Sequence, residues 1–233
     1  MSIAEKLQTI AENEQRVYDA GKKAEYDAFW DSYQENGNRT NYEYSFSGLG
    51  WNDETFKPQY DIKISQSTHM FSGCGITDLV GLLERCGVSF DTSKSIGTSY
   101  VATNSTTITT FPSYDCRNRS HMNYFITNCP KLRSIGTLTL KDDGSQAFTL
   151  NTLNGNTNLE EIRFEGVIGQ NGLDLHWSKK LSKASIESII NHLSTTTSGL
   201  TVTLSQEAVN NAFTAEEWAA LIATRTNWTI SLV

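Results

Sequence analysis

Histidine and cysteine side chains could hold a metal ion or act as base and nucleophile, but their spacing here favours neither. The four histidines are His69, His121, His176 and His192, and the four cysteines are Cys74, Cys86, Cys116 and Cys129. No histidines form the H-x-x-x-H or H-E-x-x-H pair of a zinc hydrolase, and no cysteines form the C-x-x-C pair of a zinc ribbon or thioredoxin. We therefore expect no metal site, and we expect free thiols that pack as small buried apolar residues. A disulfide is the alternative.

The remaining reactive groups do not predict a catalytic site either. Cys116 and His121 are close in sequence, as a thiol nucleophile and its base could be, but chance proximity explains that spacing equally well. Glu160 and Glu161 are adjacent, so on a strand they point to opposite sides and cannot flank one glycosidic bond at the roughly 5 Å of a retaining glycosidase. No glycine-rich nucleotide-binding loop occurs. We expect a protein without enzymatic activity and without a cofactor.

The overall charge limits the partners. Among 233 residues, 19 Lys and Arg oppose 26 Asp and Glu, which gives a formal net charge of -7. A broad basic surface for nucleic acid is therefore not expected. No run of about 18 apolar residues predicts a membrane span. The first residues lack the uninterrupted apolar stretch of a secretory signal, so we expect a cytoplasmic or phage-particle-associated protein, and its final location stays open.

The elements that must position any site begin with a predicted helix over residues 1–36. Ser2 and Glu5 have the spacing of a capping box, and apolar residues follow at intervals of three and four over residues 3–28. Two interpretations are open: the helix packs on its own domain, or it forms a coiled coil that makes the protein a dimer or trimer. The segment 37–75 is rich in aromatic residues, and we interpret it as a cap over the end of the core rather than a sugar-stacking site.

From Ile76 onward, short turn or helical segments alternate with short strands. Strands are predicted to begin near residues 88, 107, 132, 159, 200 and 228, with an extra strand within 173–180. Ile186 and Ile189 repeat the spacing of the preceding strands, but they follow an N-cap serine, Ser182, with helical spacing, so we predict a helix there. Thr214 and Glu217 predict a second helix start. The rhythm favours an α/β fold over 76–233, an irregular solenoid of parallel strands closed by the strand 227–233.

One segment resembles a known repeat family. Cys129-Pro130-Lys131-Leu132-Arg133-Ser134-Ile135, preceded by Phe125, is similar to the F-x(n)-C-x-x-L-x-x-I pattern of BspA-like leucine-rich repeats. The segment Asn156 to Ile162 repeats it with asparagine in place of cysteine, and Phe71 with Cys74, Ile76 and Leu79 is a degenerate copy. The first residues also resemble leader segments of uncharacterised repeat proteins of gut Firmicutes and their prophages. The resemblance implies a leucine-rich-repeat-like solenoid used for recognition or adhesion.

A solenoid of this kind buries one aliphatic row and exposes the residues between on one face. The Leu-x-x-Ile pattern predicts that row, with the copies Ile108-x-x-Phe111, Leu132-x-x-Ile135 and Leu159-x-x-Ile162. Here that strand face would present Thr109, Thr110, Arg133, Ser134, Glu160, Glu161 and Arg163. Such mixed charges are also typical of plain solvated surface. We expect a recognition or adhesion module that binds a protein or a glycan through this face. The alternative is a structural or attachment component of a prophage particle, oligomerised through residues 3–28.

Overall fold

The computed structural model describes residues 62–64, 71–81, 88–90, 102–118, 122, 124–145 and 152–233. The helix predicted over 1–36 and its heptad pattern over 3–28 lie outside the described residues. So does most of the aromatic segment 37–75. The expected oligomer and the expected cap therefore stay predictions.

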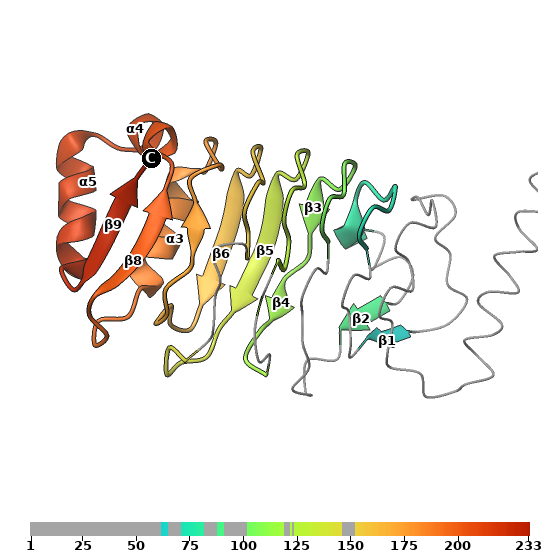
Figure 1. Cartoon of the computed structure of the whole chain (residues 1–233), viewed down its shortest axis with the longest axis horizontal. Coiled ribbons are helices and arrows are strands. Elements are labelled where there is room, and N and C mark those ends of the chain that lie inside the picture. Colours follow the sequence, from blue (N-terminus) through green and yellow to red (C-terminus); the bar gives the residue numbers. More distant parts are fainter. Residues whose placement is uncertain are drawn as a thin grey trace, which may run out of the picture.

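The described chain has an α/β fold whose paired strands all run parallel to their neighbours (Figure 1). One sheet pairs β1 (Ile62–Ile64) with β2 (Val88–Phe90), and β1 was not predicted. A second sheet contains β3 (Thr110–Phe111), β4 (Tyr114–Asp115), β5 (Ser134–Thr139) and β6 (Glu161–Glu165). A third contains β7 (Asp174–Leu175), β8 (Leu200–Leu204) and β9 (Trp228–Leu232).

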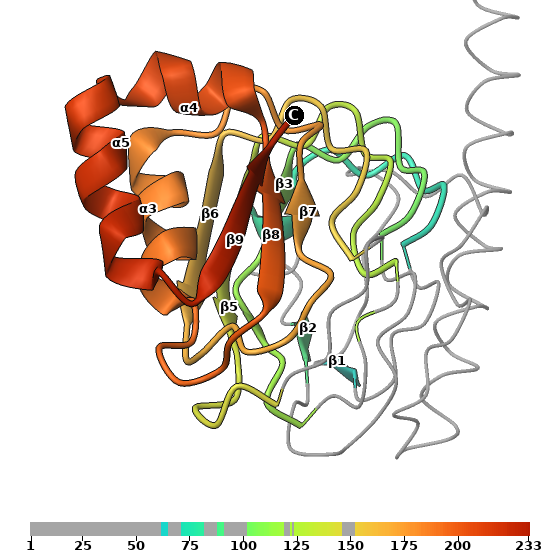
Figure 2. The same ribbon diagram turned by 60° about the vertical axis from the view of Figure 1, so that its left-hand side comes forward.

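Strands β3 to β9 lie in two rows of stacked chain segments, with β3, β4, β5 and β6 in the first row and β7, β8 and β9 in the second. In the first row, β5 pairs with β3 and β4 on one side and with β6 on the other. In the second row, Ala102 donates its amide to Phe125 and Ile126 donates to Thr152, at 3.2 and 3.1 Å. Figure 2 shows the chain alternating between these rows, with β7, β8 and β9 at the C-terminal end of the second. The strands expected near 200 and 228 therefore form, but in a different sheet from β5 and β6.

Helix α3 (Lys183–His192) lies along the edge of β6 where another strand would pair. Ser182 donates its amide to the carbonyl of Glu160 at 2.9 Å, and then the chain turns into the helix. The hydroxyl oxygens of Ser185 and Ser188 accept the amides of Ile162 and Phe164, at 3.0 and 2.9 Å. The helix predicted here is confirmed, with Ser182 as its N-cap. Its serines satisfy edge amides that would otherwise invite another strand.

Two further helices and a short 3-10 turn complete the C-terminal end. They are α4 (Gln206–Ala212), α5 (Ala215–Ile222) and η1 (Ala223–Arg225). The predicted capping box is confirmed, because Thr214 Oγ1 accepts the amide of Glu217 and Glu217 Oε2 accepts that of Thr214. The hydrogen bond from Lys183, and then that from the Thr214 amide, lower the pKa of Glu217 to about 2. Helix α4 was not predicted, although Ser205 is its N-cap.

The aliphatic row predicted from the Leu-x-x-Ile pattern forms the core of the first row. Its members are at most 2 % exposed: Ile108, Phe111, Leu132, Ile135, Leu159 and Ile162. Leu138 and Phe164 extend it along the paired strands β5 and β6. Strand pairing thus stacks apolar side chains of successive segments on one another, which removes them from water.

Beside this core lies a line of buried residues whose side chains form hydrogen bonds to the backbone of the turns between segments. Cys129 Sγ donates to the carbonyl of Ala102 at 2.8 Å, and Asn156 Nδ2 donates to the corresponding carbonyl of Ile126 at the same distance. Asn156 also donates to Leu153 and accepts the amide of Cys129. Cys74, Cys116 and Cys129 are buried free thiols, as predicted, while Cys86 lies outside the described residues. Burial raises the pKa of the Cys129 thiol to about 12.

Candidate binding surface

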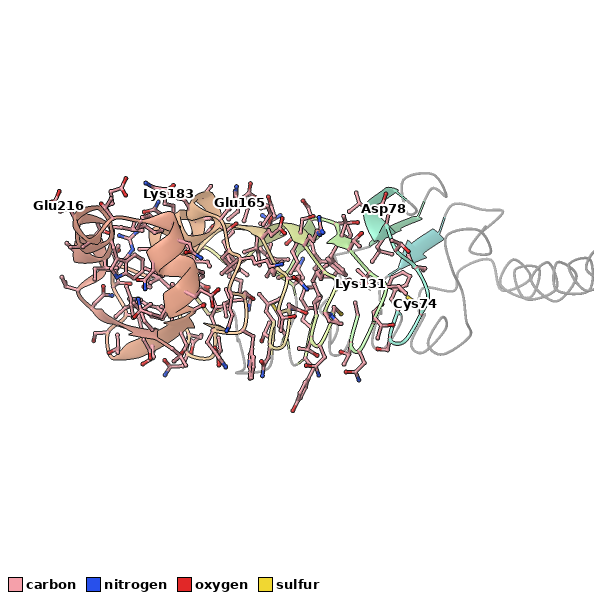
Figure 3. All side chains as sticks on the ribbon, turned by 90° about the horizontal axis from the view of Figure 1, so that it is seen from above. Cys74, Asp78, Lys131, Glu165, Lys183 and Glu216 are labelled. Carbon is pink, nitrogen blue, oxygen red and sulfur yellow. The ribbon has the colours of Figure 1, made fainter. Side chains whose placement is uncertain are left out.

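The structure brings the seven predicted residues of the strand face into adjacent positions. Thr110, Ser134 and Glu161 are register partners across β3, β5 and β6. One residue earlier, the amide of Arg133 donates to Thr109 and that of Glu160 donates to Arg133, both at 2.8 Å. The seven are Thr109, Thr110, Arg133, Ser134, Glu160, Glu161 and Arg163, and all are at least partly exposed. Figure 3 views the molecule from above, and Asp78, Glu165 and Lys183 lie along one long edge of it.

Several of these side chains already have internal partners. Thr109 donates its hydroxyl to the carbonyl of Thr77 at 2.9 Å, and Thr110 donates to Asp78 Oδ1 at 2.7 Å. Glu161 and Arg163 form an ion pair at 2.9 Å with both side chains almost half exposed. Such pairs fix side-chain positions but contribute little free energy at a solvated surface. The hydrogen-bonding groups and charges of these side chains are therefore already engaged within the protein, and the side chains contribute mainly to the shape of the strand face.

Arg133 differs from them. Its side chain is exposed and forms no hydrogen bond or ion pair with another residue that the structure describes. It lines a shallow hollow of about 420 Å³ with Thr109, Thr110, Lys131 and Asn158. Lys131 likewise has no partner within the described parts of the chain. We call the hollow lined by these five residues the basic hollow, because Lys131 and Arg133 are cations without a partner among the described residues.

Sequence reasoning missed two members of the basic hollow. Lys131 lies inside the quoted repeat segment, two residues before Arg133. Lys131 could therefore have been predicted from the sequence, because the residues of a turn lie close to the strand that follows it. Asn158 lies in the same turn of the next segment, and its amide donates to the carbonyl of Pro130 at 2.6 Å. That hydrogen bond joins the two turns beside the hollow.

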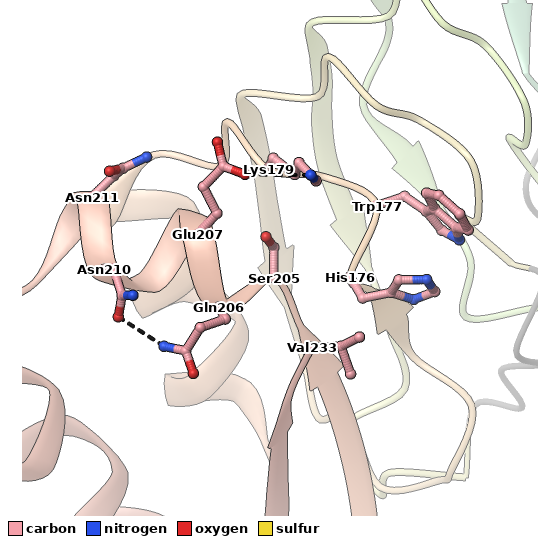
Figure 4. Close-up of a pocket in the computed structure, with 9 residues that line it drawn as sticks. All are labelled: His176, Trp177, Lys179, Ser205, Gln206, Glu207, Asn210, Asn211 and Val233. Atoms are coloured by element: carbon pink, nitrogen blue, oxygen red, sulfur yellow. Dashed lines mark hydrogen bonds and ion pairs between the residues drawn. The ribbon is translucent and has the colours of Figure 1, made fainter.

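A second hollow, of about 570 Å³, was not predicted and lies at the C-terminal end (Figure 4). It sits at the carboxyl ends of three parallel strands, because His176 follows β7, Ser205 follows β8 and Val233 follows β9. Its other lining residues are Trp177, Lys179, Gln206, Glu207, Asn210 and Asn211. We call it the tryptophan cleft. No local motif marks it, because its walls come from segments about 30 residues apart in sequence.

Neither a cluster of metal-ligating side chains nor a membrane-spanning helix occurs among the described residues. Within them, no group of three His, Cys, Asp or Glu side chains is arranged to hold a metal ion. None of the helices that the structure describes is long and apolar enough to cross a membrane.

Comparison with known proteins adds no assignment to this geometry. No protein-family model, no curated protein and no solved structure matches the chain.

Proposed function

We propose that the chain is a leucine-rich-repeat-like solenoid, of the BspA-like kind, that acts as a non-enzymatic recognition or adhesion module. The repeated construction of its turns supports this. Asn104, Asn128 and Gly155 have positive φ angles of 56°, 53° and 76°. Each directly precedes a fully buried residue, namely Ser105, Cys129 or Asn156. The same left-handed turn thus recurs after 24 and then 27 residues, as a repeat requires.

The strand face is the surface through which we propose that a protein or glycan binds. Its residues lie on paired strands or directly before them, so their backbone positions are set before a ligand arrives. Such preorganisation lowers the ordering cost of binding. The ion pair of Glu161 with Arg163 further restricts the rotamers available to both side chains.

The strongest support for this proposal comes from the two unpaired cations of the basic hollow, Lys131 and Arg133. A chain of net charge -7 holds Lys131 and Arg133 in one hollow without a carboxylate partner among the described residues. An arginine guanidinium recognises carboxylate, sulfate or phosphate through two parallel hydrogen bonds. We therefore propose that the face binds an acidic group, carried by a protein side chain or by an acidic glycan.

Hexaglutamate and a sulfated oligosaccharide are suitable probes for this proposal. Binding of the full chain to each is measured by biolayer interferometry at low and at physiological salt. Arg133→Ala should weaken binding by roughly tenfold or more, since a charge-assisted contact is lost. Lys141→Ala removes one positive charge outside the hollow and serves as the matched control. The proposal fails if neither probe binds, or if the two variants lose affinity equally.

A further inference from the structure

The tryptophan cleft contains an aromatic side chain that neighbouring residues hold at the surface. Trp177 is 46 % exposed, although it lines a hollow rather than a convex surface. The imidazole of His176 packs against the indole, with ring centroids 4.7 Å apart. Asp174 in turn holds His176, with its Oδ1 2.6 Å from Nδ1 of the imidazole. The indole is therefore supported from one side and remains available to a ligand.

The opposite wall offers hydrogen-bonding groups of both kinds. Gln206 Nε2 donates to Asn210 Oδ1 at 2.7 Å, which leaves the Gln206 side-chain oxygen and the Asn210 amide nitrogen without this contact, and both residues line the cleft (Figure 4). Asn211 has no side-chain hydrogen bond to any residue within the described ranges. Each free amide group contributes a donor, an acceptor or both. Donors and acceptors thus lie across the cleft from an apolar ring.

The tryptophan cleft differs from the basic hollow because its charged side chains are paired with each other. Lys179 Nζ lies 3.4 Å from Glu207 Oε2, so the charged groups on this wall are paired with each other. The carboxylate of Asp174 is engaged by His176. The charges of Lys179 and Glu207 balance each other, so they give this wall no net charge that would favour an ionic ligand over a neutral polar one.

We infer that the tryptophan cleft is a second binding site, which takes a neutral pyranose ring of a glycan. Such a ring has one face of C–H groups, which suits the apolar face of an indole, and a rim of hydroxyl groups, which suits amide donors and acceptors. The volume of about 570 Å³ lies within the range of ligand sites. This site is separate from the strand face and does not depend on it.

The test uses neutral hexasaccharides of glucose, mannose, xylose and N-acetylglucosamine. Each is titrated into the full chain by isothermal titration calorimetry. At least one should bind with a Kd in the millimolar range or tighter, and Trp177→Ala should weaken it by roughly tenfold or more. Asn211→Ala should weaken it by about threefold, and because alanine favours helices this variant does not threaten α4.

Two matched controls establish whether the sugar binds in the cleft. Tyr124→Ala removes another exposed aromatic, 37 % exposed and outside the cleft, and should leave sugar affinity unchanged. Arg133→Ala should also leave it unchanged, while it weakens binding of the acidic probes. The inference is overturned if no hexasaccharide binds, if Trp177→Ala binds as well as wild type, or if Tyr124→Ala loses as much affinity. Circular dichroism of each variant confirms that the fold is kept.

Discussion

Replacing Asn156 with alanine should destabilise the protein more than its size suggests. The side chain is fully buried and makes three hydrogen bonds to backbone groups. It accepts from the amide of Cys129 at 3.1 Å and donates to the carbonyls of Ile126 and Leu153 at 2.8 and 2.9 Å. The contacts with Cys129 and Ile126 link the turn of one segment to the turn before it, and the contact with Leu153 lies within the turn of Asn156 itself. Alanine would make none of them.

The magnitude follows from the number of contacts. A hydrogen bond contributes about 1 kcal/mol net, and a buried group left without its partner costs about 1–3 kcal/mol. Losing the three contacts of Asn156 should therefore lower the free energy of unfolding by about 3 kcal/mol. In a domain of this size, that loss corresponds to a fall in Tm of roughly 6–12 °C.

Urea denaturation followed by circular dichroism measures this loss directly. Asn191→Ala is the control, because Asn191 is exposed on α3, and it should change stability by less than about 0.5 kcal/mol. Asn156→Cys should lose less than Asn156→Ala, since a cysteine at the corresponding position, Cys129, donates to a carbonyl in the same way. If Asn156→Ala and Asn191→Ala unfold at the same urea concentration, the buried hydrogen bonds do not hold the turns together.

Three further outcomes follow from the local geometry. Because the pKa of Glu217 in the folded protein, about 2, lies below its ordinary value of 4.5, its contribution to stability should be full above about pH 4.5 and lost as the pH falls toward 2. Stability curves of wild type and Glu217→Gln should thus converge in acid, and a constant difference would refute this. Gly166→Ala should destabilise more than Gly199→Ala, which should cost about 1 kcal/mol. Both residues have positive φ, but only at Gly166 would a Cβ meet a backbone carbonyl, so equal losses in urea denaturation would contradict the contact. The Cys129 thiol, with a pKa of about 12, should resist iodoacetamide at pH 8 until urea unfolds the chain, as peptide mapping would show; rapid labelling of the native protein would be inconsistent with its burial.

Local signals predicted the parts of the fold that depend on a few adjacent residues. Ser182 and Thr214 begin helices because a hydroxyl at that position accepts an amide two or three residues on, and such a motif can be read from sequence. The alignment of Thr110, Ser134 and Glu161 followed from the Leu-x-x-Ile spacing, because burying one aliphatic row fixes the register.

The parts that depend on the path of the chain were not predicted. The strand LTVTL of β8 has the same alternation whichever row it joins, but α3 lies against β6, and β8 pairs with β7 and β9 in the second row. The tryptophan cleft depends on α4 packing beside the turn that holds Trp177. Trp177 and Asn210 are 33 residues apart, with no shared motif, so only the folded chain brings them to the same hollow.

Because α3 lies along the edge of β6, further segments can extend the sheet of β3, β4, β5 and β6 only on the N-terminal side of β6. A duplicated copy of residues 133–159 placed before β6 would find strand backbone on both sides and could pair at once. The same copy placed after β6 would have to displace Ser185 and Ser188 from the amides that they now accept. Gene duplication, or a designer who wishes to widen the strand face, can therefore add segments on the N-terminal side of β6, while α3 ends the sheet on the other.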